Sequence, residues 1–228
     1  MQKTLGGVPV GFIAFFSVLA LIFLAYPSID LMITSLFYDH GFFLKDHPFV
    51  SFVYRFAPLI GIGMGVWALI VLVILWIGQK ASYTCRLIPS VWRRKELAFV
   101  VLALALGPGL MVNGVFKEGF GRARPAQVVE FGGTKTFTPP FVITNQCETN
   151  CSFVCGHASA GFFFVSVALV VRREWQKRVF WSGVALGGLL GIVRIVQGGH
   201  FTSDVIFSFV AVYATGKVLY FLMFERQP

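Results

Sequence analysis

Long apolar runs separated by short polar segments dominate this chain. They cover approximately residues 8–26, 57–77, 97–116, 157–171, 179–196 and 204–224. About 20 apolar residues are needed to span the hydrocarbon core of a bilayer as a helix. The run at 157–171 is short, which fits a helix that starts inside a polar cavity. The pattern therefore predicts an all-α fold, a six-helix transmembrane bundle, in a single domain over residues 1–228.

The composition agrees with this prediction. Hydrophobic residues make up 57% of the 228 residues and charged residues only 13%, and the mean hydropathy is +0.78. These values are too apolar for an ordinary soluble domain. The first run is long and has no small-x-small cleavage site before Pro27, so we interpret it as a permanent helix and not a secretory signal.

The basic residues predict the orientation of the bundle. The net charge is +9, and many of the cations fall in segments 78–96 and 172–178, directly beside apolar runs. The positive-inside rule places both segments, and both chain ends, in the cytoplasm. No segment interleaves basic and aromatic residues on a water-exposed surface, so a nucleic-acid partner is not expected. The outward segments are then 27–56, 117–156 and 197–203.

The first outward segment carries acidic residues and histidines. Asp30, Asp39, His40, Asp46 and His47 are types that bind metals, but their spacing fits no metal-site template. A solvated loop, or a short helix in the membrane interface, is the preferred interpretation. The sequence predicts no metal and no other cofactor.

Two basic residues follow the third apolar run. Lys117 and Arg124 lie seven residues apart, so a continuing helix would place them two turns apart on one face,. There they could donate to a common anion. A basic cluster at a helix end that reaches toward the interface is the alternative.

The segment 154–161 begins the fourth run with Cys155, Gly156 and His157. A turn with glycine at a helix start presents free backbone N–H groups to a phosphate, and the helix dipole adds to the attraction. His157 would stand there as a proton donor. A polar cap without catalytic function is the simpler alternative.

The segment 194–204 joins the last two runs and contains Arg194, His200 and Asp204. His200 and Asp204 lie four residues apart at a helix start. The carboxylate can hold one ring nitrogen and leave the other facing outward as a nucleophile. Gly198 and Gly199 allow a tight turn beside a ligand. The alternative is a structural arginine–aspartate pair with an uninvolved histidine.

Together the three segments resemble the phosphatidic acid phosphatase type 2 family, which is related to vanadium haloperoxidases. Its pattern is Lys-six-Arg-Pro, then Pro-Ser-Gly-His, then Ser-Arg-five-His-three-Asp. The chain matches it in order and spacing at Lys117, Arg124-Pro125, Gly156-His157, Arg194, His200 and Asp204. It departs at Val154-Cys155, where the family has Pro-Ser, and at Val193, where it has Ser. Cys155 would be a weaker phosphate donor than serine, and its backbone N–H would then make the contact.

The resemblance implies a membrane phosphatase acting on a phosphorylated lipid without a metal. Lys117, Arg124 and Arg194 would clamp the phosphate, His200 would attack it with Asp204 holding the ring, and His157 would transfer the proton. A non-catalytic lipid-phosphate binder or transporter is the alternative from another class. Both histidines argue against it, because binding alone needs only the cations.

Loop motifs point to a subgroup. The stretches 121–125, 137–140 and 150–156 resemble the bacterial lipid A phosphatases, above all those acting at the 4′ position. This implies a multi-pass protein of the bacterial inner membrane, with its active site at the periplasmic end and no obligate protein partner. A phosphatase for undecaprenyl diphosphate or phosphatidylglycerophosphate would share the catalytic residues.

Two further expectations concern the second outward segment. An oxidising periplasm permits a disulfide between Cys147 and Cys151, whereas Cys85, in the cytoplasmic segment, should stay reduced. The long connection over residues 122–153 is larger than two helices need. It could contact a bulky head group through Arg122, Gln127, Lys135, Asn145 and Gln146. The alternative is that this connection only packs over the helices.

Overall fold

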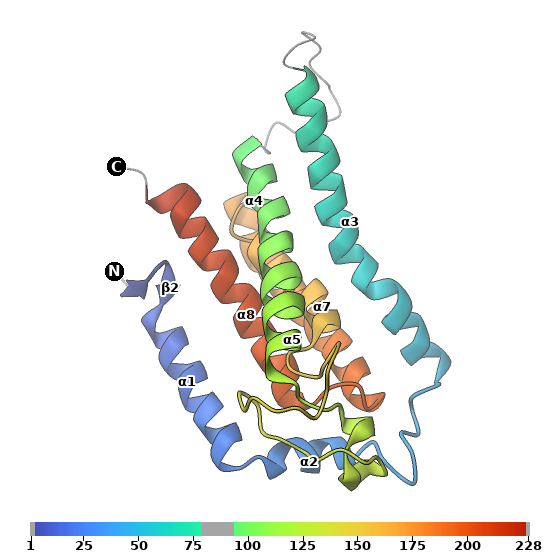
Figure 1. The fold of residues 1–228 in the computed structure, drawn as a ribbon. Helices are drawn as coiled ribbons and strands as arrows, with labels where there is room; N and C mark the ends of the chain where they lie inside the picture. Colours follow the sequence, from blue (N-terminus) through green and yellow to red (C-terminus); the bar gives the residue numbers. More distant parts are fainter. Residues whose placement is uncertain (1–2, 79–93, 227–228) are drawn as a thin grey trace.

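The computed structural model describes residues 3–78 and 94–226 of the chain, and the described part is mostly helical (Figure 1). After a small hairpin of β1 (Thr4–Leu5) and β2 (Val8–Pro9), the main helices are α1 (Val10–Ala25), α2 (Ser28–Ser35), α3 (Pro48–Gly78), α4 (Arg94–Leu104), α6 (Gly156–Val167), α7 (Arg173–Val196) and α8 (Thr202–Tyr220). The short helix η4 (Phe221–Glu225) extends α8. The all-α prediction is confirmed for the described residues, apart from the two-residue strands.

Fewer described helices are long and apolar enough to span a membrane than the six that the sequence predicted. Four described helical stretches are long and apolar enough to cross a membrane, and α1 with α2 makes a fifth only if this pair, bent by 81°, counts as one span. The helix α6 has 12 residues, which corresponds to about 18 Å and is shorter than the hydrocarbon core. A short α6 agrees with the prediction that this helix does not cross the whole bilayer.

The basic segments differ from the prediction or lie outside the described residues. Residues 79–93, which contain Cys85, are not described. The segment predicted as a loop at 172–178 is largely helical, because α7 begins at Arg173. Most of this basic segment therefore forms the first turns of α7, ahead of the predicted apolar run at 179–196.

The helix α3 starts nine residues earlier than the apolar run suggested, at Pro48. Proline suits the first position of a helix, because its fixed φ is helical and its missing N–H would have no partner there. The additional turns are less uniformly apolar than the rest of the helix. They bring Tyr54 and Arg55 to the end of the bundle where His200 lies.

The third run is one helical stretch with a change of geometry. After α4 it continues as the π-helix η1 (Ala105–Phe116), which contains Pro108, and ends with α5 (Lys117–Phe120). Gly121 stops the helix in the left-handed conformation, with φ +63°, a common helix C-terminus. The helix therefore does not continue to Arg124, so Lys117 and Arg124 do not share a helix face.

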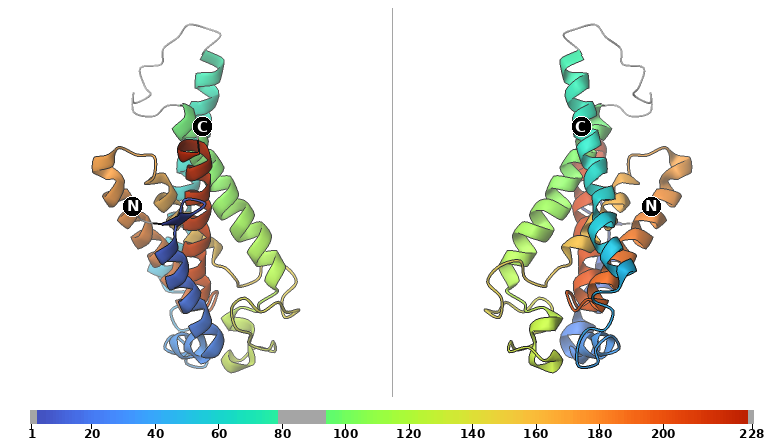
Figure 2. Two further views of the ribbon diagram at one scale, coloured as in Figure 1. Left: turned by 90° about the vertical axis from the view of Figure 1, so that its left-hand side faces the viewer. Right: turned by 90° about the vertical axis from the view of Figure 1, so that its right-hand side faces the viewer.

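The short helix α6 lies inside the bundle, packed mainly on α7 and α8. Gly161 and Gly187 allow the close approach of α6 and α7, because a Cβ at Gly161 would lie 2.6 Å from the Gly187 Cα,. Figures 1 and 2 show α2 and the connection between α5 and α6 lying across one end of the bundle. All candidate site residues lie at or near this end.

Candidate functional site

The turn between α7 and α8 positions His200. The carbonyl oxygen of Arg194 accepts hydrogen bonds from the backbone N–H groups of Gly199 (2.9 Å) and His200 (3.3 Å). Gly198 has φ +66°, a conformation that glycine adopts at little cost. The turn buries the His200 side chain, which is 1% exposed, directly before α8.

The His200 ring is held differently from the prediction. Its Nδ1 atom lies 2.7 Å from the carbonyl oxygen of Ser152 but 3.6 Å from the Asp204 carboxylate, which is longer than a hydrogen bond. Both neighbours are acceptors, so Nδ1 carries the proton in the neutral ring, and the lone pair is then on Nε2. Asp204 also holds the His200 ring indirectly. Its Oδ2 accepts hydrogen bonds from the hydroxyl of Ser152 (2.5 Å), the residue whose carbonyl oxygen contacts Nδ1, and from the N–H of Phe201 (2.8 Å), the residue that follows His200.

The surroundings also set the basicity of His200. Burial alone lowers the pKa of its imidazole. The neighbouring Cys155 and Asp204 outweigh burial and raise the pKa above the usual value for histidine,. A more basic imidazole is a stronger nucleophile once its Nε2 atom is unprotonated.

A buried ionic network that sequence reasoning missed supports Asp204. The guanidinium of Arg122 donates to Asp204 (2.6 Å), Asp30 (2.8 Å) and the Ser203 hydroxyl (2.8 Å). Asp30 also accepts from the backbone N–H of Ser203. Arg122 and both carboxylates are at most 1% exposed. The predictions of a solvated Asp30 and of a head-group contact through Arg122 are therefore wrong.

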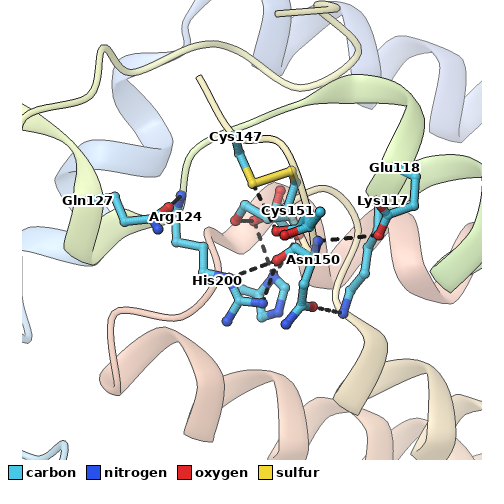
Figure 3. The surroundings of a disulfide bond; sticks show 11 residues. Lys117, Glu118, Arg124, Gln127, Cys147, Asn150, Cys151 and His200 are labelled. Atoms are coloured by element: carbon cyan, nitrogen blue, oxygen red, sulfur yellow. Dashed lines mark hydrogen bonds and ion pairs between the residues drawn. A yellow bond between two sulfur atoms is a disulfide. The ribbon is translucent and has the colours of Figure 1, made fainter. Parts of the chain in front are cut away.

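Lys117 and Arg124 are brought together by Asn150 and not by a shared helix face. Figure 3 shows Asn150 between them: its side-chain oxygen accepts from Lys117 (2.9 Å), and its carbonyl oxygen accepts from two Arg124 nitrogens (3.2 and 2.7 Å). Asn150 has φ +51°, which asparagine tolerates better than most residues. It lies in the loop closed by the disulfide between Cys147 and Cys151, which confirms that predicted pairing.

Arg194 supplies the third cation. Its side chain is 8% exposed, donates to Gln197 (2.6 Å) and lies over the Tyr54 ring at 4.9 Å. Its Nε is buried, and none of the described residues accepts a hydrogen bond from it. A buried donor without a partner is costly, so this nitrogen points to an anionic ligand.

His157 lies in the first turn of α6 and stacks on the Tyr54 ring, with centroids 4.5 Å apart. One aromatic ring therefore contacts both His157 and Arg194, a role for Tyr54 that the apolar pattern did not indicate. His157 and Lys117 line a cavity of about 480 Å³ whose other lining residues, from α3, α4, η1 and α6, are largely apolar.

Cys155 caps the helix α6, whereas Gly156 leaves space for a neighbouring cation. The Cys155 thiol is buried and accepts from the Ala158 N–H, capping α6. The Cys155 backbone N–H donates to the Asp204 carbonyl oxygen (3.1 Å), so the expectation that this group binds the phosphate is wrong. Gly156 leaves space for Lys117, because a Cβ there would lie 3.0 Å from its Nζ.

The other residues expected to contact a head group mainly organise the outer loop. Gln127 accepts from the Arg124 N–H (2.9 Å), and Gln146 accepts from Thr136 and donates to Asn145. Lys135 accepts through its carbonyl oxygen from the Val129 N–H. These contacts all join residues within the connection between α5 and α6.

The chain is similar in sequence to known lipid A phosphatases. The chain is 39% identical over 211 residues, 90% of each chain, to a lipid A 4′-phosphatase of Francisella tularensis subsp. novicida. It is 33% identical to a lipid A 4′-phosphatase of Rhizobium leguminosarum, over 52% of this chain and 51% of that protein. A lipid A 1-phosphatase of Rhizobium etli is 29% identical over 65% of this chain and 61% of its own.

No solved structure matches the chain. The family model that matches covers residues 96–228, more than half of the chain. This region contains the three cations, both histidines and Asp204. The chain belongs to the PAP2 superfamily.

Proposed function

We propose that this protein is a lipid A 4′-phosphatase of the bacterial inner membrane, with His200 as its nucleophile. The observation that carries the proposal is that Lys117, Arg124 and Arg194 lie near both His157 and His200, and that the Ser152 carbonyl oxygen holds the His200 ring through Nδ1. The long match to a 4′-phosphatase of Francisella supports the substrate. The three cations hold the transferring phosphoryl group and neutralise the charge on its oxygens.

In the first step the His200 Nε2 lone pair attacks phosphorus, and the bond from phosphorus to the sugar oxygen breaks. His157 gives a proton to the departing oxygen, so the dephosphorylated lipid leaves as an alcohol. The Ser152 carbonyl oxygen, 2.7 Å from Nδ1, and the nearby Asp204 carboxylate stabilise the positive ring. The product on the enzyme is a phosphohistidine.

In the second step water attacks the same phosphorus. His157, now neutral, takes a proton from this water, and the phosphorus–nitrogen bond breaks to release inorganic phosphate. The electron pair of that bond returns to Nε2 of His200. Both residues are then restored for a second turnover.

The cavity of about 480 Å³ provides a place for an acyl chain. Its walls include the apolar Pro58, Ile62 and Leu104 as well as the polar Lys117 and His157. An apolar chain lying between α3 and η1 would bring its phosphorylated head group to the cations. This arrangement suits a substrate that approaches from within the membrane.

The proposed topology has the site facing the periplasm. The α1–α2 pair, the four long stretches and α6 make six membrane-embedded segments, with α6 reaching only part of the way. The Cys147–Cys151 disulfide supports an oxidising compartment at this end,. Arg172, Arg173 and Lys177 lie near the start of α7, in agreement with a cytoplasmic opposite end.

The test is phosphate release by the purified protein in detergent. The panel contains lipid A, undecaprenyl diphosphate and phosphatidylglycerophosphate, with His200→Ala as control. The proposal expects release from lipid A that the control lacks. Release only from one of the other lipids would overturn the substrate, and equal release by His200→Ala would overturn the mechanism.

A further inference from the structure

A second cavity, of about 440 Å³, lies beside the candidate site and is strongly basic. Its charged lining residues are four cations, Lys45, Arg55, Arg124 and Arg194, and one carboxylate, Asp46. The volume falls in the range of small-molecule sites, roughly 300–1,000 Å³. The formal charge of the lining, four positive and one negative, favours an anionic ligand.

Lys45 and Arg55 have no role in the catalytic steps above. Lys45 lies in the connection between α2 and α3, and Arg55 lies on the second turn of α3. Both are exposed, and within residues 3–78 and 94–226 neither forms an ion pair. Cations are disfavoured in the short outward-facing segments of membrane proteins. Two cations in the lining of one cavity at the proposed periplasmic end therefore indicate a function.

The basic cavity is continuous with the phosphate clamp. Arg124 and Arg194 belong to both, and Tyr54 forms part of the cavity wall while its ring stacks on His157. A molecule whose reacting phosphate lies on Arg124 and Arg194 therefore has its adjoining part next to this cavity. An anionic group in the cavity can belong to the same molecule.

We propose that this cavity binds a second anionic group of the substrate head group, one that is not hydrolysed, through Lys45 and Arg55. The inference rests on the proposed function and narrows its substrate class to phosphorylated saccharide lipids that carry more than one acidic group. The shared chemistry is a phosphate or a sugar carboxylate on the same head group. Asp46 opposes binding by repulsion and limits the retention of the product.

The experiment measures kcat and KM on three lipids: bis-phosphorylated lipid A, lipid A with only the 4′ phosphate, and that monophosphate extended by a carboxylate-bearing sugar. The variant Lys45→Ala/Arg55→Ala is compared with Asp46→Asn. Arg173→Ala, an exposed arginine at the start of α7, is the matched control. If the wild-type enzyme prefers the bis-phosphate, the anion is a phosphate. If it prefers the extended lipid, the anion is a carboxylate.

Exposed charge pairs change affinity by roughly 1.5- to 5-fold each. The double variant is therefore expected to raise KM for the preferred lipid by about 2- to 25-fold and to lose the preference. Asp46→Asn should lower that KM, and Arg173→Ala should leave it unchanged. Equal effects of the double variant on all three lipids, or wild-type KM values that do not distinguish them, would overturn the inference. Hydrolysis of none of the three by the wild-type enzyme would instead overturn the proposed function.

Discussion

The clamp geometry predicts that Gly199→Ala inactivates the enzyme by displacing Arg194. A Cβ at Gly199 would lie 2.9 Å from the Arg194 Nε and would overlap the rest of the guanidinium. Gly199 does not have a positive φ, unlike Gly198 with φ +66°. Alanine therefore fits the backbone at position 199, and the flexible guanidinium is the part that must move.

The size of the effect follows from the role of Arg194. Removing one preorganised donor to the charge of a transition state costs about 100- to 1,000-fold in kcat, or about 2.7–4 kcal/mol. Fold stability should change much less, because glycine-to-alanine changes at compatible positions alter it by about 1 kcal/mol or less. Gly199→Ala should therefore fold normally and lose activity by about 100- to 1,000-fold.

The assay is a double-mutant cycle on lipid A hydrolysis with Gly199→Ala, Arg194→Ala and the double variant. If the alanine acts only through the guanidinium, the double variant will be no slower than Arg194→Ala alone. Gly188→Ala is the matched control, because it lies in α7 and a Cβ there would meet nothing within 4 Å. Two results would refute the role given to Arg194. One is a double variant whose loss of activity equals the product of the two single losses, and the other is near-normal activity of Gly199→Ala.

Three further predictions concern the buried network, the pH profile and metals. Asp30→Ala should lower the free energy of unfolding by about 3–5 kcal/mol, because it removes a partner of the buried Arg122; an unchanged midpoint of thermal unfolding in detergent would contradict this. His200 must be neutral to attack, so activity falls as pH drops below its raised pKa. Cys155→Ser removes one raising influence and should move this acidic limb of kcat/KM to lower pH, whereas an unmoved or upward-shifted limb would count against it. Activity should persist in excess EDTA and be inhibited by vanadate, a mimic of the five-coordinate phosphoryl group; loss with chelator that magnesium restores would show that a metal is needed.

Helices were predictable from the apolar runs because the bilayer requires long apolar segments. Their ends were less predictable wherever polar residues continue a helix. Pro48 begins α3 well before the run at 57–77, and Arg173 begins α7 before the run at 179–196. Ser51, Tyr54 and Arg55 interrupt the apolar pattern at the start of α3, and Arg173, Glu174 and Lys177 do so at the start of α7, so an apolar run does not mark these helix ends.

The end of the third helical stretch did have a signal. Glycine is common at helix C-termini, so Gly121 indicates that the helix ends before Arg124 and that Lys117 and Arg124 do not share a helix face. Their actual connection through Asn150, 33 residues from Lys117, depends on the loop closed by the disulfide. Local spacing cannot indicate such a contact.

The candidate histidines, cations and Asp204 could be identified from motif spacing, but the groups that position them could not. Arg122 contacts Asp30 across 92 residues of sequence. Nothing in the segment 27–56 distinguishes the buried Asp30 from its exposed neighbours. The Ser152 carbonyl oxygen that holds His200 is a backbone group, which any residue type would supply.

The proposed mechanism assigns the hydrolysis of a lipid A phosphate in the membrane to His200. Its most direct test is mass spectrometry of lipid A from cells expressing the wild-type protein or His200→Ala. This mechanism predicts that cells with the wild-type protein contain lipid A lacking the 4′ phosphate, and that cells with the variant contain lipid A with both phosphates. Bis-phosphorylated lipid A in both strains, with the wild-type protein present in the membrane, would contradict it.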